Sequence, residues 1–244
     1  MSIPKNIMTV WLTFDNGPLP PLIKRCIESQ KLPGYTQKVI TLENCYKGSK
    51  YVNKALEKAK ALHDAGKPIT GPWDNPLTWI VKASDWLRCY HICEEGGIYL
   101  DADMEVIPGK NFDDLLDCRF FTEIEAFGMP ANSAFGSEAG HPFLKEYLPR
   151  IEENFCGDGI MVFEPGARAF ADLMWIYDKA KNGIKIFDTS MFFPYTHGKE
   201  IIKVTPQTKV YHHYVNSWCD DRCKKKLGTE YETKDFTEIF KGKI

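Results

Sequence analysis

Three absences narrow the function of this 244-residue sequence. No apolar run reaches the ~20 residues that a membrane-spanning helix needs. The first residues, Met1 to Lys5, lack the long apolar core of a secretory signal, so we expect a cytoplasmic protein. The formal net charge is −2, whereas a nucleic-acid partner requires concentrated Lys and Arg. An integral membrane protein, a secreted protein and a nucleic-acid-binding protein are therefore disfavoured.

Glycine-rich phosphate loops are also missing. Neither G-x-G-x-x-G nor G-x-x-x-x-G-K-[ST] follows the first apolar strand, which is expected over Asn6 to Phe14. This absence argues against a dinucleotide-binding fingerprint and against a P-loop.

Eight cysteines are present, and in a chain without a secretory signal we expect them to be reduced. Cys89 and Cys93 share a C-x3-C spacing with Cys219 and Cys223. On a helix this spacing places two thiols on one face, so the four could form a zinc site. The commoner alternative is that they are small buried side chains.

The order of the expected elements indicates an α/β fold. The strand at 6–14, a helical pattern from Leu22 to Ile27 and a strand from Gln37 to Leu42 form a βαβ unit, which predicts parallel pairing. Gly96-Gly97 should end a long helix in the left-handed conformation. We expect one domain over 1–244 with a charged tail from 219. The remaining predictions are helices at Tyr51–His63, Leu77–Glu95, Pro142–Glu152 and Ala167–Lys181, and strands at Ile98–Ile107, Arg119–Ile124, Asn132–Phe135 and Lys209–Tyr214.

Two carboxylates, Asp101 and Asp103, follow a short apolar segment in the strand expected at 98–107. Residues two apart on a strand share a face, so Glu105 should point the same way. Adjacent carboxylates repel each other unless a cation lies between them. Oxygen ligands suit a hard ion such as Mg²⁺ or Mn²⁺. The alternative is an exposed edge strand with solvated acids.

Asp85 and Arg88 lie three residues apart on the preceding helix and therefore share one face. If the helix packs against the strand, this pair stands beside the carboxylates and can hydrogen-bond sugar hydroxyls. An ordinary intrahelical salt bridge is the simpler interpretation.

The run from Ala83 to Glu105 resembles the DXD-containing sugar glycosyltransferases. It matches A-S-D-x-L-R followed by G-G-[IM]-Y-L-D-x-D without a gap. These enzymes include fungal initiation-type mannosyltransferases and bacterial capsular or lipopolysaccharide glycosyltransferases, with the glucosylating domains of large clostridial toxins as more distant relatives. Segments leading to Trp11, from Pro18 to Ser29, and from Tyr211 to Trp218 are also similar to the family.

The resemblance implies a GT-A type fold, a Rossmann-like sandwich around one mixed, mainly parallel sheet. It implies retaining transfer from a nucleotide-sugar donor, with a UDP-sugar favoured and GDP-mannose as the second option. The acceptor would be a saccharide or a lipid-linked saccharide in capsule, lipopolysaccharide or other surface glycan synthesis. Mn²⁺ or Mg²⁺ would bridge the donor diphosphate.

The resemblance also implies roles for individual residues. Asp85 and Arg88 would hold the donor sugar and, with Asp103, form the catalytic set. Trp11 would stack on the base, and Tyr99 would lie in the donor site. Asp101 would contact the ribose or the metal, and Asp103 would bind the metal. Ser217 and Trp218 would contact the phosphates. His212 or His213 would contact the metal or a phosphate. No nucleophile is assigned, and Glu123, Glu125 and Asp158 are candidates only.

Two other functions stay open. A carboxylate-pair glycoside hydrolase also needs two acids beside a sugar, but it needs neither nucleotide nor metal. A catalytically silent protein that binds sugar or nucleotide is the third reading. Separately, the basic cluster from Arg222 to Lys226 could contact an anionic membrane where a lipid-linked acceptor lies.

Overall fold

A computed structural model of the chain describes residues 2–15, 17–66, 72–125, 128–153, 164–193 and 205–215. None of the helices within these ranges combines the length and the apolar character that a membrane crossing requires.

A six-stranded mixed sheet forms the centre of the molecule. Its strand order is β2-β1-β3-β6-β5-β7. Parallel pairs join β1 to β2, β1 to β3 and β5 to β7, whereas β6 runs antiparallel to β3 and to β5. The mixed, mainly parallel sheet is thus confirmed. The strands are β1 (Asn6–Val10), β2 (Thr36–Ile40), β3 (Gly97–Leu100), β5 (Phe120–Ile124), β6 (Pro130–Ser137) and β7 (Ile184–Phe187).

The opening βαβ unit is also confirmed, because α1 (Pro21–Ser29) connects the parallel strands β1 and β2. Pro20 and Pro21 begin this helix, where the missing N–H of proline costs no helical hydrogen bond.

The strand expected over Ile98–Ile107 is wrong in one respect: it is two strands joined by a turn. β3 ends at Leu100, and β4 (Met104–Val106) pairs antiparallel with β8 (Val210–His212) in a separate two-stranded sheet. The N–H of Met104 donates to the carbonyl of Asp101 over 3.0 Å and closes the turn. Aspartate favours turns because its side chain can bond nearby backbone groups, so the two acids mark the break between sheets.

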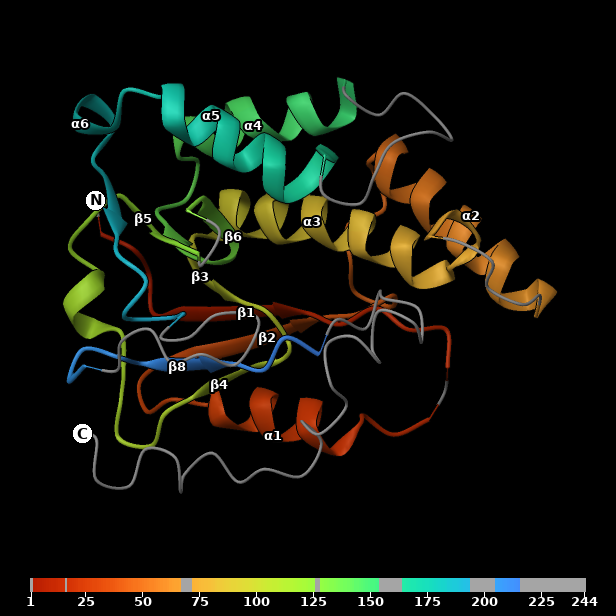
Figure 1. Cartoon of the computed structure of the whole chain (residues 1–244), viewed down its shortest axis with the longest axis horizontal. Helices are drawn as coiled ribbons and strands as arrows, with labels where there is room; N and C mark the ends of the chain where they lie inside the picture. The colour runs from red at the N-terminus through yellow and green to blue at the C-terminus, as the bar shows by residue number, and fades with distance from the viewer. Residues whose placement is uncertain are drawn as a thin grey trace.

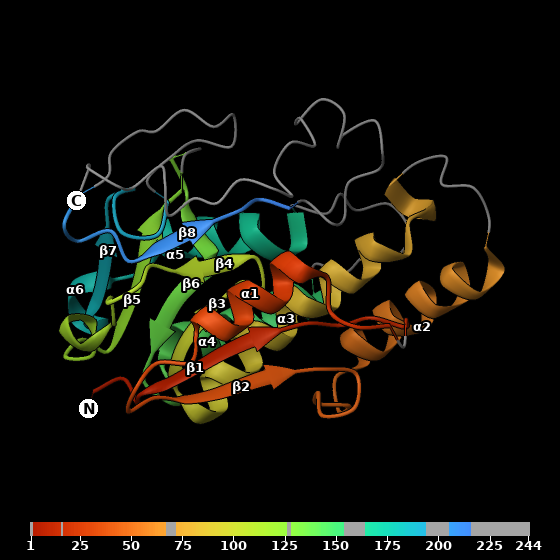
Figure 2. The same cartoon turned by 90° about the horizontal axis from the view of Figure 1, so that it is seen from below.

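Helices lie on both sides of the central sheet. Figure 1 shows α3 with α4 and α5 above the strands, and α1 on the opposite side. Figure 2 shows the small sheet of β4 and β8 beside α1. The helical elements are α2 (Lys50–Ala65), η1 (Pro72–Asp74), α3 (Pro76–Glu95), η2 (Asp113–Leu115), α4 (Pro142–Glu153), the π-helical turn η3 (Glu164–Arg168), α5 (Ala169–Ile176) and α6 (Lys179–Asn182).

The expected helix Ala167–Lys181 is interrupted. α5 ends where Tyr177 takes an extended conformation with ψ of 142°, and Asp178 then caps α6 by accepting the N–H of Lys181. Aspartate at this position satisfies a helix-start N–H, which is why the chain restarts rather than continues.

Alternate residues of β3 enter two different cores. Tyr99 packs with Phe135 and Leu87 under the helices, whereas Ile98 and Leu100 pack against the side of the small sheet. Side chains of successive strand residues point to opposite faces, so the central sheet is buried on both sides.

Gly96 and Gly97 join α3 to β3. Gly96 has φ of 67° and ψ of 169°, so it ends the helix with positive φ but not in the left-handed helical conformation predicted. A Cβ at Gly96 would lie 2.8 Å from the Ala139 nitrogen, and one at Gly97 would lie 2.7 Å from the Asn6 carbonyl. Both glycines are therefore required by backbone conformation and by close packing, which fixes how α3 delivers its side chains to the end of β3.

Candidate functional site

Arg88 connects the middle of α3 to the turn after β3. Its Nη2 lies 3.3 Å from Asp85 Oδ1, and its Nη1 lies 3.2 Å from Asp101 Oδ1. The guanidinium carbon stands 4.8 Å from the centre of the Tyr99 ring. The prediction that α3 would present an Asp–Arg pair beside the carboxylates of the next element is confirmed. One arginine thus serves two acids, and an aromatic ring supports it.

Asn132 on β6 completes this pair and was missed by the sequence analysis. Its side-chain amide donates to Asp85 Oδ1 over 3.1 Å, and its backbone carbonyl accepts from Arg88 Nη1 over 3.2 Å. The residue carries no local motif, because its role depends on the antiparallel register of β6 against β3.

Burial changes the proton affinity of these acids. Asp85 is 5% exposed, and this burial raises its pKa to about 6, with Asp101 raising it further and Arg88 opposing the shift. Burial likewise raises the pKa of Asp101, and the neighbouring Asp103 adds to the effect while Arg88 opposes it. Buried carboxylates are costly without partners, so the arginine is needed to keep both charged.

Asp103 is held by the segment that contains β8. Its Oδ1 lies 3.2 Å from His212 Nε2, and its Oδ2 accepts the N–H of Val215 over 2.8 Å. Burial alone would raise the pKa of Asp103, but His212 and the Val215 N–H outweigh it and hold the pKa at about 2. Asp103 is therefore an ionised carboxylate throughout the neutral range.

Asp101, Asp103 and His212 could together hold a cation. Each offers one ligand atom, and these atoms lie within 4.8 Å of one another. Two carboxylates and one imidazole suit Mn²⁺ or Mg²⁺ in charge and donor type. The predicted pairing of the two aspartates is thus present, although a turn and not a strand face brings them together.

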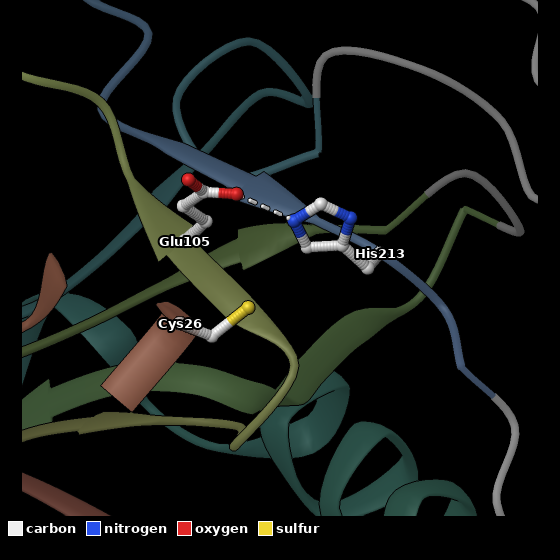
Figure 3. A group of neighbouring side chains, drawn as sticks. All are labelled: Cys26, Glu105 and His213. Carbon is white, nitrogen blue, oxygen red and sulfur yellow. Dashed lines mark hydrogen bonds and ion pairs between the residues drawn. The ribbon is translucent and has the colours of Figure 1, made fainter. Parts of the chain in front are cut away.

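Glu105 does not join this group. His213 Nε2 lies 2.8 Å from Glu105 Oε2, and Cys26 stands beside them as shown in Figure 3. The prediction that Asp101, Asp103 and Glu105 share a face is wrong, because the turn at 101–103 removes the period-two register. Of the two histidines, His212 lies with the aspartates and His213 with Glu105.

The comparisons with known proteins agree with this geometry. Residues 24–121 match the family model described as "Glycosyltransferase sugar-binding region containing DXD motif". This segment is therefore similar to the sugar-binding region of DXD-containing glycosyltransferases. The match covers less than half of the chain, and it includes Asp85, Arg88, Asp101 and Asp103.

One solved structure supports the fold assignment, and two others are similar at lower TM-scores. The PaToxG glycosyltransferase is 17% identical to this chain and superposes with a TM-score of 0.50, covering 71% of this chain and 69% of its own. The UDP-bound glycosyltransferase domain of the YGT toxin has a TM-score of 0.47 at 10% identity, with coverage of 76% and 79%. Mouse xyloside xylosyltransferase 1 has a TM-score of 0.42 at 12% identity, with coverage of 87% and 98%. No curated protein matches. The fold is of the GT-A type.

Trp11 lies beside the turn that carries Asp101 and Asp103. It follows β1, and its backbone N–H donates to the Ile40 carbonyl over 2.8 Å. Its side chain is only partly buried. Its side chain belongs to a small cluster with Ala102, which separates the two aspartates, and with Val215. Ser217 and Trp218 lie outside the described residues.

Tyr99 and Gly166 shape the buried side of the site. The Tyr99 hydroxyl donates to Asp101 Oδ1 over 2.7 Å. Gly166, in η3, lies so close to Asp85 that a Cβ there would overlap Asp85 Oδ2, and Tyr147 holds the Gly166 carbonyl through a 2.7 Å hydrogen bond. No sequence pattern marks Gly166, since its importance arises only where η3 meets α3.

Glu123 is a structural carboxyl rather than an accessible nucleophile. It is fully buried and accepts the N–H groups of Met191, Phe192 and Phe193 at 3.1, 2.9 and 3.3 Å. Burial raises its pKa to about 8, although the three N–H donors act to lower it. Of the other two candidates, Glu125 lies in the turn after β5, and Asp158 lies outside the described residues.

The proposed four-thiolate site is only half described. Cys89 and Cys93 are buried in α3, and neither belongs to a group that could hold a metal among the described residues. Cys219 and Cys223 lie outside them.

Proposed function

We propose that this protein is a metal-dependent retaining glycosyltransferase that takes its sugar from a nucleotide-sugar donor. A UDP-sugar is the favoured donor, and GDP-mannose is the second option. The observation that carries the proposal is the continuous chain of contacts from Asp85 through Arg88 to Asp101, beside Asp103 and His212. It supports a sugar-binding role for Asp85 and Arg88 next to a group that could hold a cation.

The cation would be held by Asp103, His212 and Asp101. Arg88 and Tyr99 both contact Oδ1 of Asp101, so the other oxygen would face the ion. A bound Mn²⁺ or Mg²⁺ supplies Lewis-acid stabilisation of the diphosphate that departs from the sugar. The low pKa of Asp103 supports this role, because a metal ligand must be ionised at the working pH.

The donor sugar would lie against Asp85 and Arg88. A carboxylate and a guanidinium fixed 3.3 Å apart can accept from and donate to neighbouring hydroxyls through charge-assisted hydrogen bonds. Asn132 and Tyr99 hold this pair before the substrate arrives, which reduces the cost of ordering it. Trp11 would stack on the nucleotide base.

Retention would proceed on one face of the sugar. A double displacement needs a carboxylate nucleophile, and the fully buried Glu123 is committed to three backbone N–H groups. We therefore favour the leaving phosphate as the base that accepts the proton of the acceptor hydroxyl.

The acceptor would be a saccharide or a lipid-linked saccharide in capsule, lipopolysaccharide or other surface glycan synthesis. The enzyme would then work in the cytoplasm, peripherally at the inner face of the membrane. The basic residues from Arg222 to Lys226 would provide the contact with anionic lipid. Co-sedimentation with anionic liposomes checks this contact: a chain ending before Asp220 should lose binding that the full chain has.

A nucleotide screen tests the proposal. Thermal unfolding is measured with UDP or GDP, each with and without Mn²⁺, and hydrolysis of UDP- and GDP-sugars follows. A nucleotide at a hundred times its Kd stabilises the folded state by about 2.7 kcal/mol. We expect one nucleotide to raise the Tm, and to do so far more with Mn²⁺ than without. If no nucleotide changes the Tm, the donor assignment is wrong. Metal-independent cleavage of simple glycosides would instead favour the hydrolase.

A further inference from the structure

We propose that Cys26, Glu105 and His213 form a second divalent-cation site, suited to Zn²⁺ and separate from the Asp101–Asp103–His212 group. The proposal does not depend on the donor or on the reaction.

Three elements that are far apart in the sequence bring these side chains together. Cys26 lies on α1, Glu105 on β4, and His213 directly after β8. Figure 3 shows the three side chains converging on a common space, and their ligand atoms lie within 4.8 Å of one another. Ligands around a tetrahedral zinc are roughly 3.3–3.8 Å apart, given metal–ligand bonds of about 2.0–2.3 Å. Small side-chain shifts would therefore complete a three-ligand site.

The surroundings favour a cation at this position. Cys26 and His213 are both 0% exposed, and the carboxylates of Glu105 and Asp103 lie near the thiol. Burial raises the pKa of Cys26, and these two carboxylates raise it further. The thiol is thus neutral in the free protein, and a divalent ion would both neutralise Glu105 and stabilise the thiolate as its ligand.

Arg25 is the competing cation. Its Nε and Nη2 each lie 3.2 Å from Glu105 Oε2, the same oxygen that contacts His213. Arg25 is 46% exposed at its side chain, so it can move into solvent when an ion binds Glu105. A partly exposed ion pair of this kind contributes little stability, and its loss is a small cost.

The donor atoms distinguish the two metal groups. A thiolate with an imidazole and a carboxylate is a ligand set for Zn²⁺, whereas two carboxylates with one imidazole accept Mn²⁺ or Mg²⁺. The second ion would link α1 to β4 and to the chain after β8. The same stretch donates the Val215 N–H to Asp103, so zinc would fix the backbone that borders the first group.

Cobalt reports thiolate ligation directly, because a thiolate bound to Co²⁺ absorbs in the near ultraviolet and oxygen or imidazole ligands do not. Reduced full-length protein is titrated with Co²⁺. We expect a thiolate band in the wild type and in Asp103→Asn, which removes a ligand of the other group but none of the three ligands proposed here. In Asp103→Asn the band should saturate at one equivalent. It should vanish in Cys26→Ser and persist in the control Cys45→Ser, another buried cysteine outside both groups. No band in the wild type, or an unchanged band in Cys26→Ser, overturns the proposal.

Two more ligand variants guard against misfolding of Cys26→Ser. Glu105→Gln and His213→Gln should each weaken Co²⁺ binding at least about tenfold while circular dichroism stays unchanged. Zn²⁺ should raise the Tm of the wild type and of Asp103→Asn by more than it raises the Tm of these two variants, which retain the Asp101–Asp103–His212 group. Equal Zn²⁺ stabilisation of the wild type and both ligand variants would place the ion elsewhere. A failed nucleotide screen beside a positive cobalt titration would contradict the donor assignment alone.

Discussion

The part of the chain that matches the family model and the part that follows it contribute differently to the site. The matched segment, 24–121, supplies Asp85, Arg88, Asp101 and Asp103. The later part supplies neutral or neutralising partners, namely Asn132, Gly166 and His212. Charge thus comes from the motif, and the arrangement of that charge comes largely from residues beyond it.

This division has an electrostatic reason. Arg88 pairs with the buried Asp85 and the partly exposed Asp101, and burial raises the pKa of Asp85 to about 6. His212 offsets the third acid, so that Asp103 keeps a pKa of about 2. Buried charges without partners are strongly destabilising, so the motif would not form a stable site in isolation.

The largest expected effect is on the motif itself, in Asp103→Asn. Removing the carboxylate charge removes a cation ligand, and turnover of the correct nucleotide-sugar should fall at least about a thousandfold. Hydrolysis of that donor with Mn²⁺ measures the change, and circular dichroism should show an intact fold.

Two variants sharpen this result. Asp172→Asn makes the same chemical change at an exposed carboxylate that pairs with Arg168, and turnover should not change. His212→Gln removes the partner from the later region and should cost less than Asp103→Asn. Equal losses for the two would mean that His212 is as important for holding the cation as Asp103, and the division between charge and arrangement would not hold.

How far the sequence predicts the structure follows the same division. The α3 pair and the two aspartates were predictable because they are local in sequence: three apart on a helix, and two apart after an apolar strand. The turn at Asp101–Asp103 was not predictable. One strand that runs on through Met104 and Val106 shows the same alternation of apolar and polar residues as two strands in different sheets. The separation of His212 from His213 depends on that turn.

Partners that arise from long-range packing left no pattern. Asn132 reaches Asp85 only because β6 pairs antiparallel with β3, and Gly166 matters only because η3 packs on α3. A lone asparagine or glycine in a sequence has many ordinary explanations, so neither signals a role by itself.

The second-largest expected effect is at Gly166, where the later region contacts Asp85 of the motif. In Gly166→Ala the new methyl group would overlap Asp85 Oδ2, so either η3 or the carboxylate must move. We expect a stability loss of about 1–3 kcal/mol. Displacing Asp85 should also lower kcat/KM for the donor by up to about a hundredfold. Urea unfolding and donor kinetics measure the two changes.

Gly17→Ala is the matched control, because a Cβ at Gly17 would meet no atom within 4 Å. It should leave both stability and kcat/KM near the wild-type values. Wild-type kinetics in a folded Gly166→Ala protein would show that the close approach to Asp85 has no functional weight.

The smallest expected effect lies in the later region away from the motif, at Glu123. Burial raises its pKa from 4.5 to about 8, so between these values the folded state holds a proton that the unfolded state has released. The stabilisation of the folded state by this group is fully present below about pH 4.5, and it is lost as the pH rises through 8. Glu123→Gln stays neutral, so its Tm should fall less than that of the wild type between pH 6 and pH 8.

Glu146→Gln, at an exposed carboxyl paired with Arg150, should keep the wild-type slope of Tm against pH. Parallel Tm profiles for the wild type and Glu123→Gln would mean that Glu123 is ionised in the folded protein. The three N–H groups of Met191 to Phe193 would then outweigh its burial.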